Sequence, residues 1–197
     1  MEWFPSGIKR RPLAAIDFEA SCLPCAESWP IEVAVVHEDG RECSWLVRPE
    51  AGWLAGGTWD PASEAVHGIS LDTLLATGRP AGDVAGELAG EVAGCCLVSD
   101  HSATDGPWLA MLCATGDIDP PHLEDLAEFH YGWLNDMGGG DAWAALSAVS
   151  ALMETAAARH PARHRAVPDA RRLMDFLRAV IAEPAPHGQA PSFQKSR

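Results

Sequence analysis

The chain has 197 residues, of which 28 are acidic and 14 are lysine or arginine, and its formal net charge is −14. This acidic balance excludes a passive nucleic-acid binder with a broad basic face. It does not exclude an enzyme that acts on phosphodiesters, because a bound divalent metal changes the charge of its own site. With no apolar run near the roughly 20 residues that span a bilayer, and no leader segment, we expect a cytoplasmic protein with no membrane partner.

The first half of the chain predicts three β-strands. Residues 13–19 begin as an apolar run of the buried-strand type, and residues 31–37 are rich in β-branched side chains. Asp39 and Gly40 form a turn signature, after which residues 41–48 alternate between polar and apolar. The second and third strands are therefore predicted to form an antiparallel hairpin beside the first.

Helices alternate with buried strands in the rest of the chain. The expected elements are loops over 20–30 and 49–58, helices over 59–66, 71–76 and 81–93, a strand over 95–99, a helix from Asp105 or Gly106, and helices over 142–158 and 168–182. Residues 122–129 fit either a fifth strand or a helix start. This order predicts an α/β fold, with a five-stranded mixed sheet flanked by helices in one domain over 1–182. The proline-rich segment 183–197 is expected to be a flexible tail.

Two acidic residues stand one residue apart at the end of the first strand. Residues i and i+2 of a strand point to the same face, so Asp17 and Glu19 are predicted to lie side by side. Their like charges repel, and paired carboxylates suit a hard cation such as Mg²⁺ or Mn²⁺. The alternative is that both are solvated acids on an edge strand.

Further candidate ligands occur where later elements begin. Asp105 follows the strand over 95–99 by a short loop, and Asp169 lies in the first turn of the last helix, with His164 in the preceding loop. Each residue also has a simpler interpretation. Asp105 could be an N-cap, Asp169 could compensate the helix dipole, and His164 could be a surface imidazole.

Taken in order, these residues resemble the motifs of the DEDDh 3′–5′ exonucleases, the superfamily of the proofreading subunits and RNase T. Residues 16–19 (Ile-Asp-Phe-Glu) are similar to the first exonuclease motif and residues 98–105 to the second. Residues 164–170 (His-Arg-Ala-Val-Pro-Asp-Ala) resemble the third, and residues 67–69 match a His-Gly-Ile element that these proteins often carry. The resemblance covers most of the chain and implies an RNase H-like fold.

The resemblance also implies an activity and its site. It implies 3′–5′ hydrolysis of phosphodiesters at the 3′ end of single-stranded DNA or RNA, by a two-metal mechanism. The two Mg²⁺ or Mn²⁺ ions would be held by Asp17, Glu19, Asp105 and Asp169. His164 would be the general base, since an ordinary histidine pKa of about 6.5 suits that task at neutral pH.

Contacts to the nucleic acid follow from the same motifs. The residues implied in substrate binding are Phe18, Ala20, Ser21, His67 and His101. The second motif departs from the family pattern, because His101 and Thr104 stand where an asparagine and an aromatic residue are usual. Residues 20–22 (Ala-Ser-Cys) likewise replace a Thr-Thr-Gly-like turn, so we expect a substrate preference that differs from the family's. Arg163 and Arg165 are candidates for phosphate contacts.

Two other readings remain open at the level of sequence. The chain could be a catalytically inactive exonuclease-like module that binds or scaffolds, although all four carboxylates and the histidine are present. It could instead be a thiol or zinc protein that uses Cys22 and Cys25, but no second ligand pair at zinc-site spacing accompanies them. The choice between DNA and RNA, and the existence of a homodimer, are not decided by the sequence.

Overall fold

The computed structural model describes residues 11–23, 25–130, 154–156, 158–159 and 164–182. Its strands form one six-stranded sheet in the order β4-β3-β2-β1-β5-β6. The strand bounds are β1 Leu13–Ala20, β2 Pro30–His37, β3 Glu42–Arg48, β4 Arg79–Pro80, β5 Cys96–Ser99 and β6 Leu123–Asp125. Strands β1, β2 and β3 are antiparallel neighbours, whereas β5, β6 and β4 join in parallel.

This architecture confirms the predicted α/β fold with an antiparallel hairpin and parallel strands, and corrects its strand number from five to six. The additional strand, β4, has only two residues and pairs with the end of β3. Its Pro80 is also the N-cap of the following helix, so the sequence signal for a helix start concealed the short strand. Residues 122–129, predicted as either a strand or a helix start, contain both, since β6 is followed directly by helical residues from Leu126.

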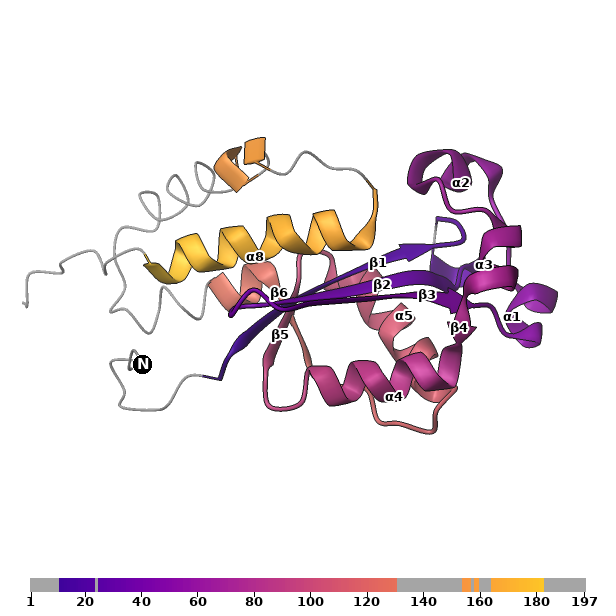
Figure 1. The fold of residues 1–197 in the computed structure, drawn as a ribbon, viewed down its shortest axis with the longest axis horizontal. Helices are drawn as coiled ribbons and strands as arrows, with labels where there is room; N and C mark the ends of the chain where they lie inside the picture. Colours follow the sequence, from indigo (N-terminus) through magenta and orange to yellow (C-terminus); the bar gives the residue numbers. More distant parts are fainter. Residues whose placement is uncertain (1–10, 24, 131–153, 157, 160–163, 183–197) are drawn as a thin grey trace, which may run out of the picture.

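Helices cover both faces of the sheet (Figure 1). Helix α8 (Ala166–Ala182) packs on one face, and α4 (Ala81–Glu91) and α5 (Ser102–Ala114) pack on the other. Side chains of β1 alternate between these two layers, as a strand requires. Leu13 and Ala15 face α8, while Ala14 and Ile16 face α4 and α5. None of the described helices is long and apolar enough to cross a membrane.

Three short helices gather at one end of the sheet (Figure 1). They are α1 (Ala51–Gly56), α2 (Pro61–His67) and α3 (Leu71–Thr77). The expected loop over 49–58 is therefore wrong in part, because glycines at both ends of α1 hid a helix with no buried residue. Most of the predicted helix over 142–158, and all of the predicted tail over 183–197, lie outside the described residues.

A glycine allows this end of the sheet to pack closely. A Cβ atom at Gly78 would lie 2.4 Å from the Leu74 carbonyl oxygen and 2.8 Å from the Arg48 backbone nitrogen, so backbone would have to move. We expect Gly78→Ala to lower the free energy of unfolding by about 2 kcal/mol, the size of an ordinary overpacking effect. Gly90→Ala is the matched control: no atom lies within 4 Å of its Cβ position in α4, so it should be neutral or stabilising. Urea unfolding of both variants measures the difference.

Candidate metal centre

Carboxylates from β1 and α8 meet on the α8 face of the sheet. Asp17 and Glu19 continue the row of β1 side chains that faces α8, and Asp169 lies in the first turn of that helix. One carboxylate oxygen from each of the three lies within 4.8 Å of the other two. The structure thus brings the predicted strand pair together with the predicted late aspartate.

Asp17 belongs to a second group as well. Its carboxylate lies within 4.8 Å of oxygens from Asp100 and Asp105, by the same measure. These residues arrive from the end of β5, which is parallel to β1 and hydrogen-bonded to it, so the carboxyl ends of both strands meet at one edge. Asp17 is therefore shared by two adjacent groups of three carboxylates.

The position of Asp105 in its helix differs from the expectation. Helix α5 begins at Ser102, three residues earlier than predicted, so Asp105 lies within the first turn and is not the N-cap. Its carboxylate is buried at 3% exposure and accepts a 2.5 Å hydrogen bond from the Ser99 hydroxyl. The last residue of β5 thus fixes the orientation of Asp105 toward Asp17.

Asp100 is the carboxylate that the sequence did not single out. It lies within the second motif-like segment, but its neighbour Asp105 already filled the expected role. The sequence does carry a signal for Asp100 as a candidate ligand, because this residue directly follows a buried strand. The Arg172 guanidinium lies 3.7 Å from Asp100 and 3.0 Å from Asp169, so one arginine of α8 contacts both groups.

Crowding and burial raise the proton affinity of this site. Burial, then the charges of Asp105 and other neighbouring carboxylates, raises the pKa of Asp17 well above its ordinary value. Burial and Asp169 raise the pKa of Glu19 to about 8. Burial raises the pKa of Asp105 to about 7, against the lowering effect of its Ser99 hydrogen bond. Without a cation, the carboxylates are therefore costly to ionise together.

The oxygen donors of this site fit hard divalent ions. Mg²⁺ and Mn²⁺ prefer carboxylate ligands, and the two groups of three sharing Asp17 offer positions for two neighbouring ions. Asp169 Oδ1 is buried and lies 3.0 Å from Arg172 Nη1, an ion pair that holds this carboxylate beside Asp17 and Glu19. The residues present therefore fit the predicted metals.

A buried carboxylate fixes the start of α8. Glu32 of β2 is 4% exposed and accepts hydrogen bonds from Arg165 Nε at 2.9 Å, Arg165 Nη2 at 2.6 Å and the Ala166 backbone N–H at 3.0 Å. Arg165, considered above for phosphate contact, is thus engaged with Glu32. Arg163 lies outside the described residues.

His164 lies immediately before this anchored arginine. Its side chain is exposed, and its backbone has a positive φ of 49°, a conformation uncommon for residues other than glycine. It is not a member of either carboxylate group. The chain therefore turns sharply at His164, directly before α8 delivers Asp169 to the site.

The predicted substrate-binding residues occupy different surroundings. Phe18 is buried on the opposite face against Trp108, with ring centroids 6.4 Å apart, and Ala20 is also buried. The Ser21 hydroxyl is buried and accepts a hydrogen bond from the Trp29 backbone N–H. His101 is 77% exposed beside Asp100.

His67 differs from these residues because part of its ring has no partner. It is 5% exposed, and its Nδ1 accepts a hydrogen bond from the Ile69 backbone N–H. Its buried Nε2 makes no hydrogen bond within the described residues. With Nδ1 acting as acceptor, the neutral ring carries its proton on Nε2, which leaves an unsatisfied donor.

The thiol alternative gains no support from the geometry. Cys22 is a buried free cysteine, and burial raises the pKa of its thiol, which makes the reactive thiolate less accessible. Nothing is described of the Cys25 side chain. Cys22 belongs to no metal-ligand cluster within the described parts of the chain.

Comparison with known proteins finds similarity in structure but none in sequence. No protein-family model and no curated protein matches the sequence. Two solved structures of exonuclease I match 87% of this chain with TM-scores of 0.63 and 0.64, at 13% and 14% sequence identity. One is the zinc-bound complex of the Escherichia coli enzyme with single-stranded DNA. The chain shares its fold with exonuclease I.

The similarity is limited in extent. This chain spans 40–41% of the length of those two exonuclease I chains. Exonuclease I from Methylocaldum szegediense matches over 66% of this chain and 31% of its own, with 13% identity and a TM-score of 0.52. The match confirms the predicted RNase H-like architecture, with its mixed sheet flanked by helices.

Proposed function

We propose that this protein is a metal-dependent 3′–5′ exonuclease that hydrolyses phosphodiesters at the 3′ end of single-stranded DNA or RNA. The observation that carries the proposal is the convergence of the predicted carboxylates from β1, α5 and α8 on one edge of the sheet. The exonuclease I fold, seen in a complex with single-stranded DNA, supports the substrate class. The net negative charge is compatible with this substrate once cations fill the site.

The carboxylates would hold two Mg²⁺ or Mn²⁺ ions. Asp17 would be the shared ligand, with Glu19 and Asp169 on one side and Asp100 and Asp105 on the other. When bound, such ions supply a water of lowered pKa and stabilise the attacking and leaving oxygens of the phosphodiester. Ser99 and the Glu32–Arg165 pair would position the ligands, because they orient Asp105 and anchor the start of α8.

His164 would act as the general base. It is exposed two residues before the start of α8 and five residues before Asp169, where its imidazole could reach an approaching 3′ end. A base removes the proton of the attacking water and needs no direct contact with the carboxylates in the free protein.

His67 is our candidate for a contact to the substrate phosphate. Its unsatisfied Nε2–H is a donor, and Glu32 and Arg165 at the start of α8 are close enough to influence its pKa. Burial lowers that pKa, so the ring would donate as a neutral group.

An end-labelling assay tests the activity. Single strands of DNA and RNA, labelled at the 3′ or the 5′ end, are incubated with Mn²⁺ or with EDTA. Immediate release of the 3′ label and stepwise shortening of the 5′-labelled strand, both only with Mn²⁺, is the expected result. Mn²⁺ binding without cleavage of any strand would instead indicate an inactive binding module and would contradict the proposal.

Substituting the general base should separate chemistry from metal binding. We expect His164→Ala to lower kcat by about 10²- to 10⁴-fold, the usual contribution of general acid–base catalysis, while Mn²⁺ affinity stays within about twofold. His122→Ala is the matched control, because His122 is another exposed histidine, 73% exposed just before β6, and is assigned no role in the site. An equal loss of kcat in the two variants would contradict the role of His164 as general base.

A further inference from the structure

A second group of metal-binding side chains lies away from the carboxylates. It consists of His37 at the end of β2, Cys43 near the start of β3 and Glu91, the last residue of α4. In the register of the sheet, His37 is opposite Ala14, whereas Glu19 is opposite Glu32. The group therefore lies near the hairpin turn, at the other end of β1 and β2 from the carboxylates.

The group also belongs to the other face of the sheet. Cys43 packs against the core shared with α4 and α5, and Glu91 is supplied by α4 itself. Asp17 and Glu19 follow the alternating row that faces α8. The sheet thus separates the two clusters, and neither shares a residue with the other.

Ligand atoms from the three residues converge within 4.8 Å of one another. His37 Nε2 lies 3.6 Å from Glu91 Oε2. Two ligands bound about 2.0–2.1 Å from one tetrahedral ion lie roughly 3.3 Å apart, so only a small movement is needed. The Cys43 sulfur lies within 4.8 Å of the same carboxylate.

An unsatisfied atom points to a missing ligand. His37 is 3% exposed, and its Nε2 is buried without a hydrogen bond in the described structure. The 3.6 Å separation from Glu91 is too long to satisfy it. Burial lowers the pKa of His37, which favours the neutral ring that a metal ion requires. A buried imidazole in this state is costly unless something binds it.

We propose that His37, Cys43 and Glu91 form a binding site for a Zn²⁺-type transition-metal ion, distinct from the carboxylate centre. Nitrogen, thiolate and carboxylate together select borderline and soft ions over Mg²⁺. Glu91 is one-third exposed and provides the route to solvent, with the fourth coordination position left for water. A bound ion would join the β2–β3 hairpin to the end of α4.

The Arg41 guanidinium would compete with such an ion for the Glu91 carboxylate. Its Nη1 donates a 2.6 Å hydrogen bond to Glu91 Oε2, and its side chain is 57% exposed. Because Arg41 also pairs with Asp39 in the same turn, it can leave Glu91 without losing every partner. Removing its positive charge should therefore tighten metal binding.

Cobalt absorption tests the site directly. The full-length protein is titrated with Co²⁺ in excess Mg²⁺, which occupies the carboxylates, and the thiolate-to-cobalt charge-transfer band is recorded. We expect the band in the wild type, its displacement by Zn²⁺ and its loss in Cys43→Ser. His37→Gln and Glu91→Gln should weaken Co²⁺ binding by about tenfold or more, and Arg41→Gln should strengthen it by severalfold.

Cys96→Ser is the matched control, because Cys96 is a half-buried cysteine on the α8 face of β5. It should keep the band. Absence of the band in the wild type, or its persistence in Cys43→Ser, would overturn the proposal. Nuclease activity is not part of the readout, so the result is independent of the proposed function.

Discussion

Asp17→Asn is expected to melt at a higher temperature than the wild type when divalent metal is absent. In the free protein, Asp17 is close to carboxylates of both groups, and burial and their charges raise its pKa. The amide keeps the shape of the side chain and removes one negative charge. We expect a rise of about 3–6 °C at pH 8, equivalent to roughly 1–3 kcal/mol for a domain of this size.

The size of this gain should depend on pH. Asp17, Glu19 and Asp105 have raised pKa values, the last two about 8 and about 7, so the folded state holds protons that the unfolded state has released. Stability of the metal-free wild type therefore falls as pH rises from about 5 to 8. The advantage of Asp17→Asn should be smaller at pH 5 than at pH 8.

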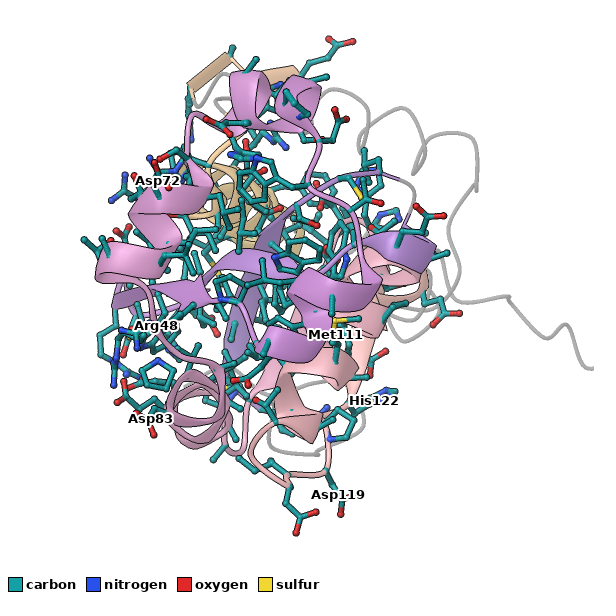
Figure 2. All side chains as sticks on the ribbon, turned by 90° about the vertical axis from the view of Figure 1, so that its right-hand side faces the viewer. Arg48, Asp72, Asp83, Met111, Asp119 and His122 are labelled. Atoms are coloured by element: carbon teal, nitrogen blue, oxygen red, sulfur yellow. The ribbon has the colours of Figure 1, made fainter. Side chains whose placement is uncertain are left out.

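Asp83→Asn controls for a general effect of charge. Asp83 is an exposed residue of α4 at the periphery of the molecule (Figure 2), and it belongs to neither carboxylate group. It should leave the melting temperature within about 1 °C. A lower melting temperature for Asp17→Asn would mean that its carboxylate makes a stabilising structural contact, which contradicts a repulsive cation site.

Arg165→Met should destabilise the fold and also reduce nuclease activity. The substitution leaves the Glu32 carboxylate, 4% exposed, with only the Ala166 backbone N–H among the hydrogen bonds described above. Removing one partner of a buried pair typically lowers the free energy of unfolding by 3–5 kcal/mol. Because Arg165 is half exposed, we expect a loss at the lower end of this range, about 3 kcal/mol. Movement of the start of α8 would displace both His164 and Asp169.

A second arginine–glutamate pair, with its arginine within α8, provides a close control. Arg171 also makes a bidentate pair with a strand glutamate, Glu42, and both arginines are 45% exposed. The side chain of Glu42 is 32% exposed, whereas the side chain of Glu32 is 5% exposed. Arg171→Met should therefore cost under about 1 kcal/mol by urea unfolding. Equal losses for the two variants would show that burial of Glu32 does not govern the stability of the helix start.

The sequence predicted the elements whose signals are local. The β2–β3 hairpin follows from Asp39-Gly40, and Ser70 caps α3 as expected by accepting a hydrogen bond from the Thr73 backbone N–H. The alternation of β1 placed Asp17 and Glu19 on one face. These features depend on neighbours within a few residues, so pattern and turn chemistry suffice.

Other features depend on contacts between distant segments. Nothing local distinguishes Arg165 as the partner of Glu32, since they are 133 residues apart and a surface arginine looks the same in sequence. The proximity of Asp100 to Asp17 depends on β5 pairing with β1. The His37–Cys43–Glu91 group likewise requires α4 to end beside the hairpin.

The central claim is that the edge carboxylates form a divalent-cation centre, and a Mn²⁺ titration tests it most directly. Bound Mn²⁺ is counted by loss of the free-ion electron paramagnetic resonance signal at pH 7.5, for wild type, Asp17→Asn and Asp83→Asn. We expect wild type and Asp83→Asn to bind about two ions, and Asp17→Asn to lose at least one, because Asp17 is common to both groups. Unchanged Mn²⁺ binding by Asp17→Asn would contradict the claim.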